Sequence, residues 1–137
     1  MKIPHNALVA VADGERFRLM RNTGPIFEPK LELVAEPSLR MPVPGAESRS
    51  DDRGTLTTAG SQTDLAEVAH GAAVVEWLNA KALKGEIDQL VVVADPRTLG
   101  EMRPHYHKLL REKIVAELAK ELTGESPQSI AETLAAA

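Results

Sequence analysis

The run Gln89–Ala94 constrains the fold more than any other segment. From its second residue onward it is continuously apolar and rich in valine, which is typical of a strand covered by packing on both of its faces. Asp95 and Pro96 follow at once, in the order of a helix cap and a first helical residue. A strand that is buried on both sides and leads directly into a helix predicts an α/β domain.

The residues before this run predict antiparallel strands. Ala7–Ala12 is a short apolar run, and Arg16–Arg21 alternates between polar and apolar residues. Asp13-Gly14 between them predicts a two-residue hairpin turn, because that turn needs positive φ at its central positions. Leu31–Glu36 alternates less cleanly and predicts a third antiparallel strand.

A long helix is predicted between the third strand and the valine-rich run. Asp64 is the expected cap, with Glu67 three residues later completing the reciprocal capping arrangement. Lys84-Gly85 supplies a cationic last turn and a glycine stop. One apolar stripe at helical spacing is expected to face the core: Leu65, Val68, Ala72, Val75, Leu78 and Ala82.

Beyond Pro96 the pattern predicts a short helix, an ambiguous segment and a last helix. The short helix buries Leu99 and Met102 and ends near Pro104, and the last helix, capped at Ser126-Pro127, buries Ile130 and Leu134. Between them, apolar residues recur at helical spacing from Tyr106 to Leu122, yet Ile114–Leu118 also fits a closing strand.

With a strand at Ile114–Leu118, the chain reads as three strands, helix, strand, helix, strand and helix. This is the element order of the ribonuclease H-like architecture, in which a mixed five-stranded sheet is the middle of three layers and the first and fourth strands are parallel neighbours. No internal repeat or second domain is visible, so we expect one domain over residues 1–137.

Composition excludes several classes of protein. The net charge of −4 over 137 residues argues against a general polyanion binder, so no DNA partner is expected, although a local basic patch is compatible with that total. Without cysteine there is no disulfide framework or thiolate chemistry. No stretch is long enough to span a membrane and no secretory signal opens the chain, so a cytoplasmic location is expected.

Residues 37–62 differ in character from the rest of the chain. Proline, glycine and small polar residues dominate, which predicts a long mobile loop of functional importance or disorder. The loop carries Arg40, Arg49 and Arg53, balanced by acidic residues nearby. Mixed charge of this kind is usually solvated surface, but arginines that cluster could bind RNA phosphates.

Several segments in order carry a resemblance to a known family: Val11–Gly14 leading to Arg18-Leu19, Glu32–Val34, Ser50–Gly54, Leu90–Gly100 and Val115–Thr123. On these segments the sequence resembles the bacterial host attachment protein family, described as required for attachment to host cells. That family is related to the middle domain of archaeal and eukaryotic peptide-chain release factors. The resemblance implies a strand rather than a helix at Ile114–Leu118.

The same resemblance draws attention to Gly60-Ser61-Gln62. Release-factor middle domains carry Gly-Gly-Gln on a mobile loop just before a long helix, where it promotes peptidyl-tRNA hydrolysis. Here serine replaces the second glycine, and its Cβ restricts the backbone conformations that glycine allows. We therefore expect Gly60, Ser61 and Gln62, with Arg49 and Arg53, to bind rather than to catalyse.

Other polar residues suggest an alternative chemistry. Asp13 and Asp95 each follow a predicted central strand, so their carboxylates are expected at one sheet edge, where with Glu67 they could hold Mg²⁺ for a nuclease. A turn residue and a helix cap explain both locally. His70 is expected to pack beside the apolar stripe, and His105 and His107 are expected at a solvated helix end.

Three functions remain open on the sequence. The preferred one is a non-enzymatic release-factor-like domain that binds the ribosome or tRNA through residues 37–62. The second is a hydrolase, acting on peptidyl-tRNA through Gln62 or on nucleic acid through Asp13 and Asp95. The third is a protein-interaction adaptor. No nucleotide-binding or hydrolase motif is present, so no cofactor is expected.

Overall fold

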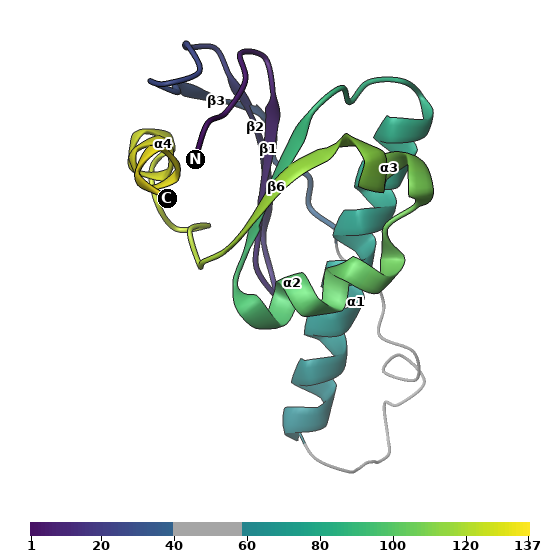
Figure 1. Cartoon of the computed structure of the whole chain (residues 1–137). Helices are drawn as coiled ribbons and strands as arrows, with labels where there is room; N and C mark the ends of the chain where they lie inside the picture. The colour runs from purple at the N-terminus through teal and green to yellow at the C-terminus, as the bar shows by residue number, and fades with distance from the viewer. Residues whose placement is uncertain (40–58) are drawn as a thin grey trace.

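The fold is a mixed five-stranded sheet with helices on both faces (Figure 1). The computed structural model describes residues 1–39 and 59–137, with side chains in the second range from Leu65 onward. The strands are β1 (Leu8–Ala12), β2 (Phe17–Asn22), β3 (Leu31–Ala35), β5 (Leu90–Ala94) and β6 (Ile114–Ala119). The helices are α1 (Ala59–Leu83), α2 (Pro96–Met102), the 3-10 turn η1 (Arg103–His105), α3 (Lys108–Lys113) and α4 (Pro127–Ala136).

The strand order across the sheet is β3-β2-β1-β5-β6. β1 pairs antiparallel with β2 and parallel with β5, and β5 pairs parallel with β6. The predicted hairpin, third strand and parallel neighbours at the centre are therefore confirmed. The strand at Ile114–Leu118 is confirmed as well. Of the segment whose apolar residues recur at helical spacing, the part before the strand forms the short helix α3.

Two apolar clusters cover the two faces of the sheet. Leu90, Val92 and Ala94 pack with α1, α2 and α3, whereas Val91 and Val93 pack with α4 on the opposite face. All five residues of β5 are fully buried. The unbroken apolar run follows from this position, because a strand between two helical layers has no face that water reaches.

The predicted helix ends at Gly85 and Asp95 are confirmed. Gly85 has φ 74°, and its N–H donates to Ala82 while that of Glu86 donates to Lys81, which together form the Schellman ending. A side-chain oxygen of Asp95 accepts the N–H of Thr98 at 3.1 Å and so caps α2.

The first turn differs from the predicted two-residue hairpin. Ala12 pairs with Phe17, which leaves a four-residue connection, and neither Asp13 nor Gly14 has positive φ. The reason is the Asp13 side chain, which accepts the backbone N–H groups of the turn itself and so stabilises an ordinary right-handed conformation.

The start of α1 also differs from prediction. The helix begins at Ala59 and not after Asp64, because no proline interrupts residues 59–63 and a capping pattern permits a start without enforcing it. Leu65 and Val68, expected in the core, are 50% and 38% exposed. The first turns of α1 extend beyond the sheet, which does not cover the apolar stripe there (Figure 1).

Both outer strands carry a β-bulge. Leu19 and Met20 pair with Ala35 and Leu33, so Val34 has no partner on β2. The first two residues of β5 pair with residues 114 and 116, so Val115 is left out in the same way. Among the described helices, none is both long and apolar enough to cross a membrane.

Candidate functional site

Asp13 and Asp95 line one polar pocket, as the strand topology predicts. β1 and β5 are parallel and in register up to Ala12 and Ala94, so the residue after each strand reaches the same sheet edge. The pocket has a volume of about 330 Å³. Its remaining lining comes from the hairpin turn, from α1 and α2, and from the chain after β6: Gly14, Glu15, Arg16, Glu67, Thr98 and Glu121.

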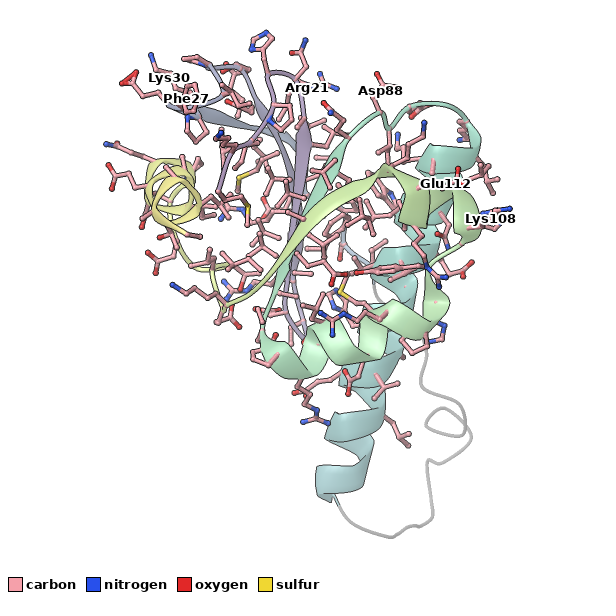
Figure 2. The ribbon with its side chains drawn as sticks, in the orientation of Figure 1. Arg21, Phe27, Lys30, Asp88, Lys108 and Glu112 are labelled. Carbon is pink, nitrogen blue, oxygen red and sulfur yellow. The ribbon has the colours of Figure 1, made fainter. Side chains whose placement is uncertain are left out.

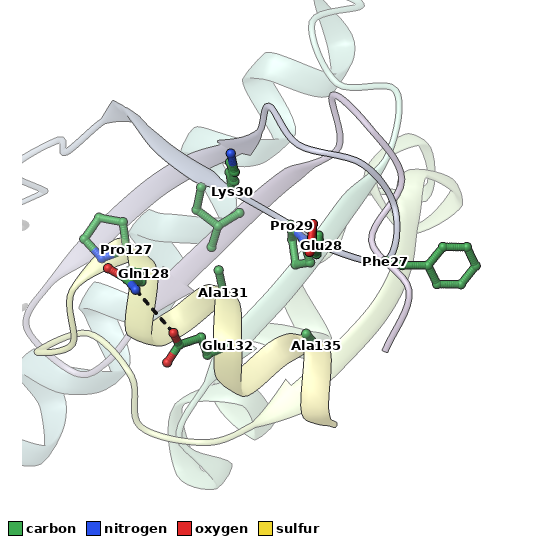
Figure 3. Close-up of a pocket in the computed structure, with 10 residues that line it drawn as sticks. Phe27, Glu28, Pro29, Lys30, Pro127, Gln128, Ala131, Glu132 and Ala135 are labelled. Atoms are coloured by element: carbon green, nitrogen blue, oxygen red, sulfur yellow. Dashed lines mark hydrogen bonds between the residues drawn. The ribbon is translucent and has the colours of Figure 1, made fainter.

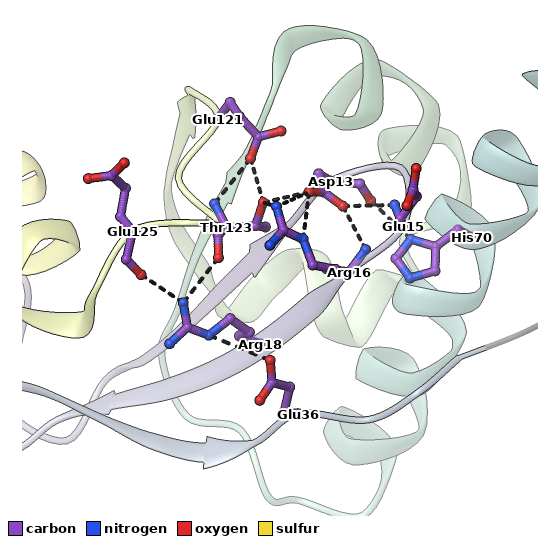
Figure 4. Close-up of polar contacts among 9 residues, drawn as sticks. All are labelled: Asp13, Glu15, Arg16, Arg18, Glu36, His70, Glu121, Thr123 and Glu125. Atoms are coloured by element: carbon purple, nitrogen blue, oxygen red, sulfur yellow. Dashed lines mark hydrogen bonds and ion pairs between the residues drawn. The ribbon is translucent and has the colours of Figure 1, made fainter.

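Asp13 is held by donors on every side (Figure 4). Its Oδ1 accepts the backbone N–H groups of Glu15 and Arg16 at 2.7 and 2.6 Å. Its Oδ2 accepts the hydroxyl of Thr123 at 2.5 Å and the Arg16 guanidinium at 3.3 Å. Burial by itself raises the pKa of Asp13, but the Thr123 hydroxyl, the two N–H groups and the Arg16 charge together lower it below its ordinary value.

Thr123 joins the turn to the segment that follows β6. Its hydroxyl lies 2.5 Å from Asp13 and also 2.5 Å from Glu121 Oε1, and since it has one proton it donates to one carboxylate at a time. Arg18 donates to the carbonyls of Thr123 and Glu125 at 3.1 and 2.8 Å. The polar network therefore fastens residues 121–125 to the first hairpin.

Asp95 is less fully satisfied. One of its oxygens caps α2, while Oδ1 is buried and has no hydrogen-bond partner among the described residues. The carboxylate of Glu67 forms an ion pair with Arg97 at 3.2 Å. Glu67 also packs against the hairpin turn, and a Cβ on Gly14 would lie 2.8 Å from its Cγ. Gly14 is thus needed for close approach and not for its φ.

His70 lies beneath the turn. It is 6% exposed, and its Nδ1 lies 2.9 Å from the backbone oxygen of Asp13. Because a carbonyl only accepts, Nδ1 must carry a hydrogen and donate it to Asp13. Nε2 is buried without a partner in the described part of the chain. The prediction of a packed histidine is confirmed.

The polar groups of the pocket stabilise the hairpin turn and do not leave an open site for a metal ion at Asp13. A cation that approached Asp13 would have to displace Arg16 and Thr123, since both carboxylate oxygens already accept hydrogen bonds. Among the side chains of residues 1–39 and 65–137, no group of three or more His, Cys, Asp or Glu is arranged to hold a metal ion. A role for Asp13 and Asp95 in metal chemistry stays a prediction.

The other predicted site residues lie apart from this pocket. Gly60, Ser61 and Gln62 fall in the first turns of α1, about 10 Å along the helix axis from Glu67. Arg40, Arg49 and Arg53 lie outside the described residues. His105 and His107 are exposed, and His107 caps α3 by accepting the N–H of Leu109. The expectation of a solvated helix end is confirmed for both.

Sequence reasoning missed Thr123 and Glu121. Both follow β6, which is parallel to β5, so the rule that brings Asp13 and Asp95 together applies to them too. Their positions could have been predicted once Ile114–Leu118 was taken as a strand. What no pattern indicated is that the Thr123 hydroxyl would reach the Asp13 carboxylate, a residue 110 positions earlier.

A larger hollow of about 830 Å³ lies between the β2–β3 connection and α4 (Figure 3). Its walls include Pro29, Lys30, Ala131 and Glu132, whereas the ring of Phe27 points away from it. Its lining includes charges of both signs, from Glu28, Lys30 and Glu132, as well as apolar residues. It contains none of the predicted site residues.

A comparison with models of protein families identifies a family for this chain. The model of the bacterial archaeo-eukaryotic release factor family 12 matches residues 6–134. The release-factor relationship expected from the ordered segments is thereby confirmed over nearly the whole chain. No curated protein matches the chain.

Proposed function

Because the chain belongs to the bacterial archaeo-eukaryotic release factor family 12, we propose that it is a non-enzymatic release-factor-like domain that associates with the ribosome or tRNA. Residues 37–62 and the start of α1 form the contact. Attachment to a host, which the sequence resemblance suggested, is then an indirect result of an effect on translation. The proposal also implies a cytoplasmic location, where ribosomes are found.

The observation that carries the proposal is the projection of α1. Its first part, residues 59–66, which we name the α1 tip, extends beyond the sheet, with Leu65 exposed (Figure 1). Gly60-Ser61-Gln62 lies within this tip. A projecting helix start is the part of the domain that can enter a confined site while the sheet stays outside.

Two features favour binding over catalysis. Serine at position 61 removes the backbone freedom of the second glycine, and residues 60–62 are helical and so do not use that freedom.

The strand order β3-β2-β1-β5-β6 and the helices on both faces support a ribonuclease H-like assignment for the scaffold. The scaffold alone does not specify an activity.

Co-sedimentation with ribosomes tests the proposal. The full chain is compared with a variant that lacks residues 45–58, which leaves α1 intact, and with Gln62→Ala. We expect the full chain to sediment with ribosomes, Gln62→Ala to associate more weakly because Gln62 lies in the proposed contact, and the deletion variant to remain in the supernatant. Equal association of the full chain and the deletion variant, or none by either, would overturn the proposal.

A capture experiment separates this function from a protein adaptor. The full chain is used to capture partners from lysate with and without ribonuclease treatment. Under the proposal, ribonuclease releases the captured material. Partners that remain bound after treatment, and are lost from the deletion variant, would favour an adaptor instead.

One observation favours a metal-dependent nuclease as the second candidate. Asp13, Glu67 and Asp95 line the same pocket at the carboxyl ends of parallel strands. The test is Mg²⁺-dependent cleavage of RNA and DNA by the full chain, by Asp95→Asn and by the exposed control Asp88→Asn. The nuclease assignment requires cleavage that Asp95→Asn abolishes and Asp88→Asn leaves unchanged.

A further inference from the structure

Positive charge is concentrated in residues 103–113, which we name the cationic segment. It consists of η1, α3 and the residues between them. Four of its eleven residues are lysine or arginine and one is acidic, a net charge of +3 in a chain whose total is −4. The basic residues are Arg103, Lys108, Arg111 and Lys113, with His105 and His107 among them.

Buried contacts hold the cationic segment in place. Tyr106 and Leu110 point into the core, and the Tyr106 hydroxyl donates to Glu117 at 2.8 Å. Asn79 on α1 donates to the carbonyl of His105 and accepts the N–H of His107, both at 3.0 Å. The backbone is therefore fixed before any ligand arrives, which lowers the entropic cost of binding.

The basic side chains are turned outward and mostly uncompensated. Arg103, Lys108 and Arg111 are exposed and Lys113 is half-buried. Arg103 pairs with Glu117 at 2.8 Å, but the other three make no ion pair with a residue in the described ranges. Lys108 points to solvent at the α3 end of the molecule (Figure 2).

A shallow hollow of about 620 Å³ adjoins the cationic segment and is lined by Arg103, Arg111 and the first residues of β6. Guanidinium groups bind phosphate through two parallel N–H bonds. Arg103 is held by Glu117, which also lines the hollow, so Arg111 is the guanidinium left to bind a phosphate there. Lys108 lies one helical turn before Arg111 on α3 and adds a second positive charge beside it.

We propose that the cationic segment is a second RNA contact, which binds backbone phosphates. The inference rests on the proposed function and adds a surface to it. Asn79 lies twenty residues after Ala59 on α1, so the segment is about 30 Å along the helix axis from the first residue of the α1 tip. An RNA that meets both must span that distance, which selects a folded or duplex RNA over a nucleotide.

Binding of fluorescently labelled tRNA, followed by anisotropy at 50 and 200 mM KCl, tests the inference. Lys108→Ala/Arg111→Ala is compared with the matched control Arg21→Ala/Lys30→Ala, which removes the same charge from exposed residues elsewhere (Figure 2). We expect affinity at low salt to fall about tenfold in the first variant only. The slope of log K against log salt should become shallower by about 1.5, since two phosphate contacts are lost.

Several outcomes would overturn the inference. Equal weakening by both double variants would mean that net charge alone attracts RNA. No change in either, or no tRNA binding by the full chain, would exclude a phosphate contact at this surface. If the first variant lost ribosome co-sedimentation but bound tRNA normally, the surface would contact an acidic protein instead. If Lys108→Ala/Arg111→Ala bound tRNA normally while ribosome association still required residues 45–58, the second contact would be refuted and the proposed function would remain.

Discussion

Replacement of Thr123 by valine tests whether the polar network holds the chain after β6 to the first hairpin. Valine keeps the shape of threonine but removes the hydroxyl that donates to Asp13 or Glu121 and accepts from Arg16 at 3.1 Å. Thr123 is buried, so no water replaces the lost partner. A hydrogen bond to a charged group contributes about 1.5–3 kcal/mol, and the added methyl offsets part of it, so we expect a loss of about 2 kcal/mol at pH 7.

The same variant makes a prediction about pH. Thr123 helps to hold the pKa of Asp13 below its ordinary value, so its contribution to stability is fully present while the unfolded carboxyl is ionised, above about pH 4. It is lost as the pH falls through the lower pKa of the folded state. The free-energy difference between the wild type and Thr123→Val should therefore be constant above about pH 5 and decrease below about pH 4.

Urea unfolding followed by the fluorescence of the single tryptophan measures both effects. Trp77 packs edge-on against Phe17, with ring centroids 5.3 Å apart, and so reports on the core beside the first hairpin. Thr98→Val is the matched control, because Thr98 is also buried but makes no side-chain bond to Asp13. A loss below about 0.5 kcal/mol, or one that stays the same at pH 3 and pH 7, would refute the reasoning.

Four further substitutions test other parts of the fold by the same unfolding measurement. Gly85→Ala should destabilise by about 1 kcal/mol because φ is 74°, whereas Gly100→Ala, in a helix and with no atom within 4 Å of the new Cβ, should be neutral or stabilising. Asn22→Ala should cost about 3 kcal/mol, since this buried side chain donates to two backbone carbonyls at 2.9 and 3.3 Å and accepts two backbone N–H groups at 2.9 and 3.0 Å. Tyr106→Phe should cost about 1–2 kcal/mol through the lost bond to Glu117; the tyrosinate absorbance of the wild type should stay suppressed at pH 10, because burial and then that bond raise the pKa of Tyr106.

The sequence predicted well wherever a local signal and the global fold agree. Asp95 precedes a proline and caps its helix, and Gly85 ends α1 with positive φ, since both depend only on neighbouring residues. The unbroken apolar run predicted β5 because only burial on both faces permits it. The strand at Ile114–Leu118 needed the family resemblance, because its apolar spacing fits a helix equally well.

Prediction failed where the environment, and not the pattern, decides. Leu65 and Val68 continue the apolar stripe of α1, but the sheet ends before it reaches them, and a stripe does not reveal how far its partner extends. Asp13 was predicted to be a turn residue. Its side chain accepts backbone N–H groups of the turn and so stabilises a four-residue connection in place of the two-residue turn that Asp-Gly suggests. The bond between Thr123 and Asp13 joins residues from opposite ends of the chain, beyond any local rule.

The unpaired valines at the two margins of the sheet bear on how this molecule meets others. Val34 and Val115 are 47% and 48% exposed, and each interrupts the ladder on an outer strand. A neighbouring chain that tried to extend the sheet would find the spacing of N–H and C=O groups broken within a few residues. The bulges therefore disfavour association by edge-to-edge strand pairing and favour association through contacts between side chains.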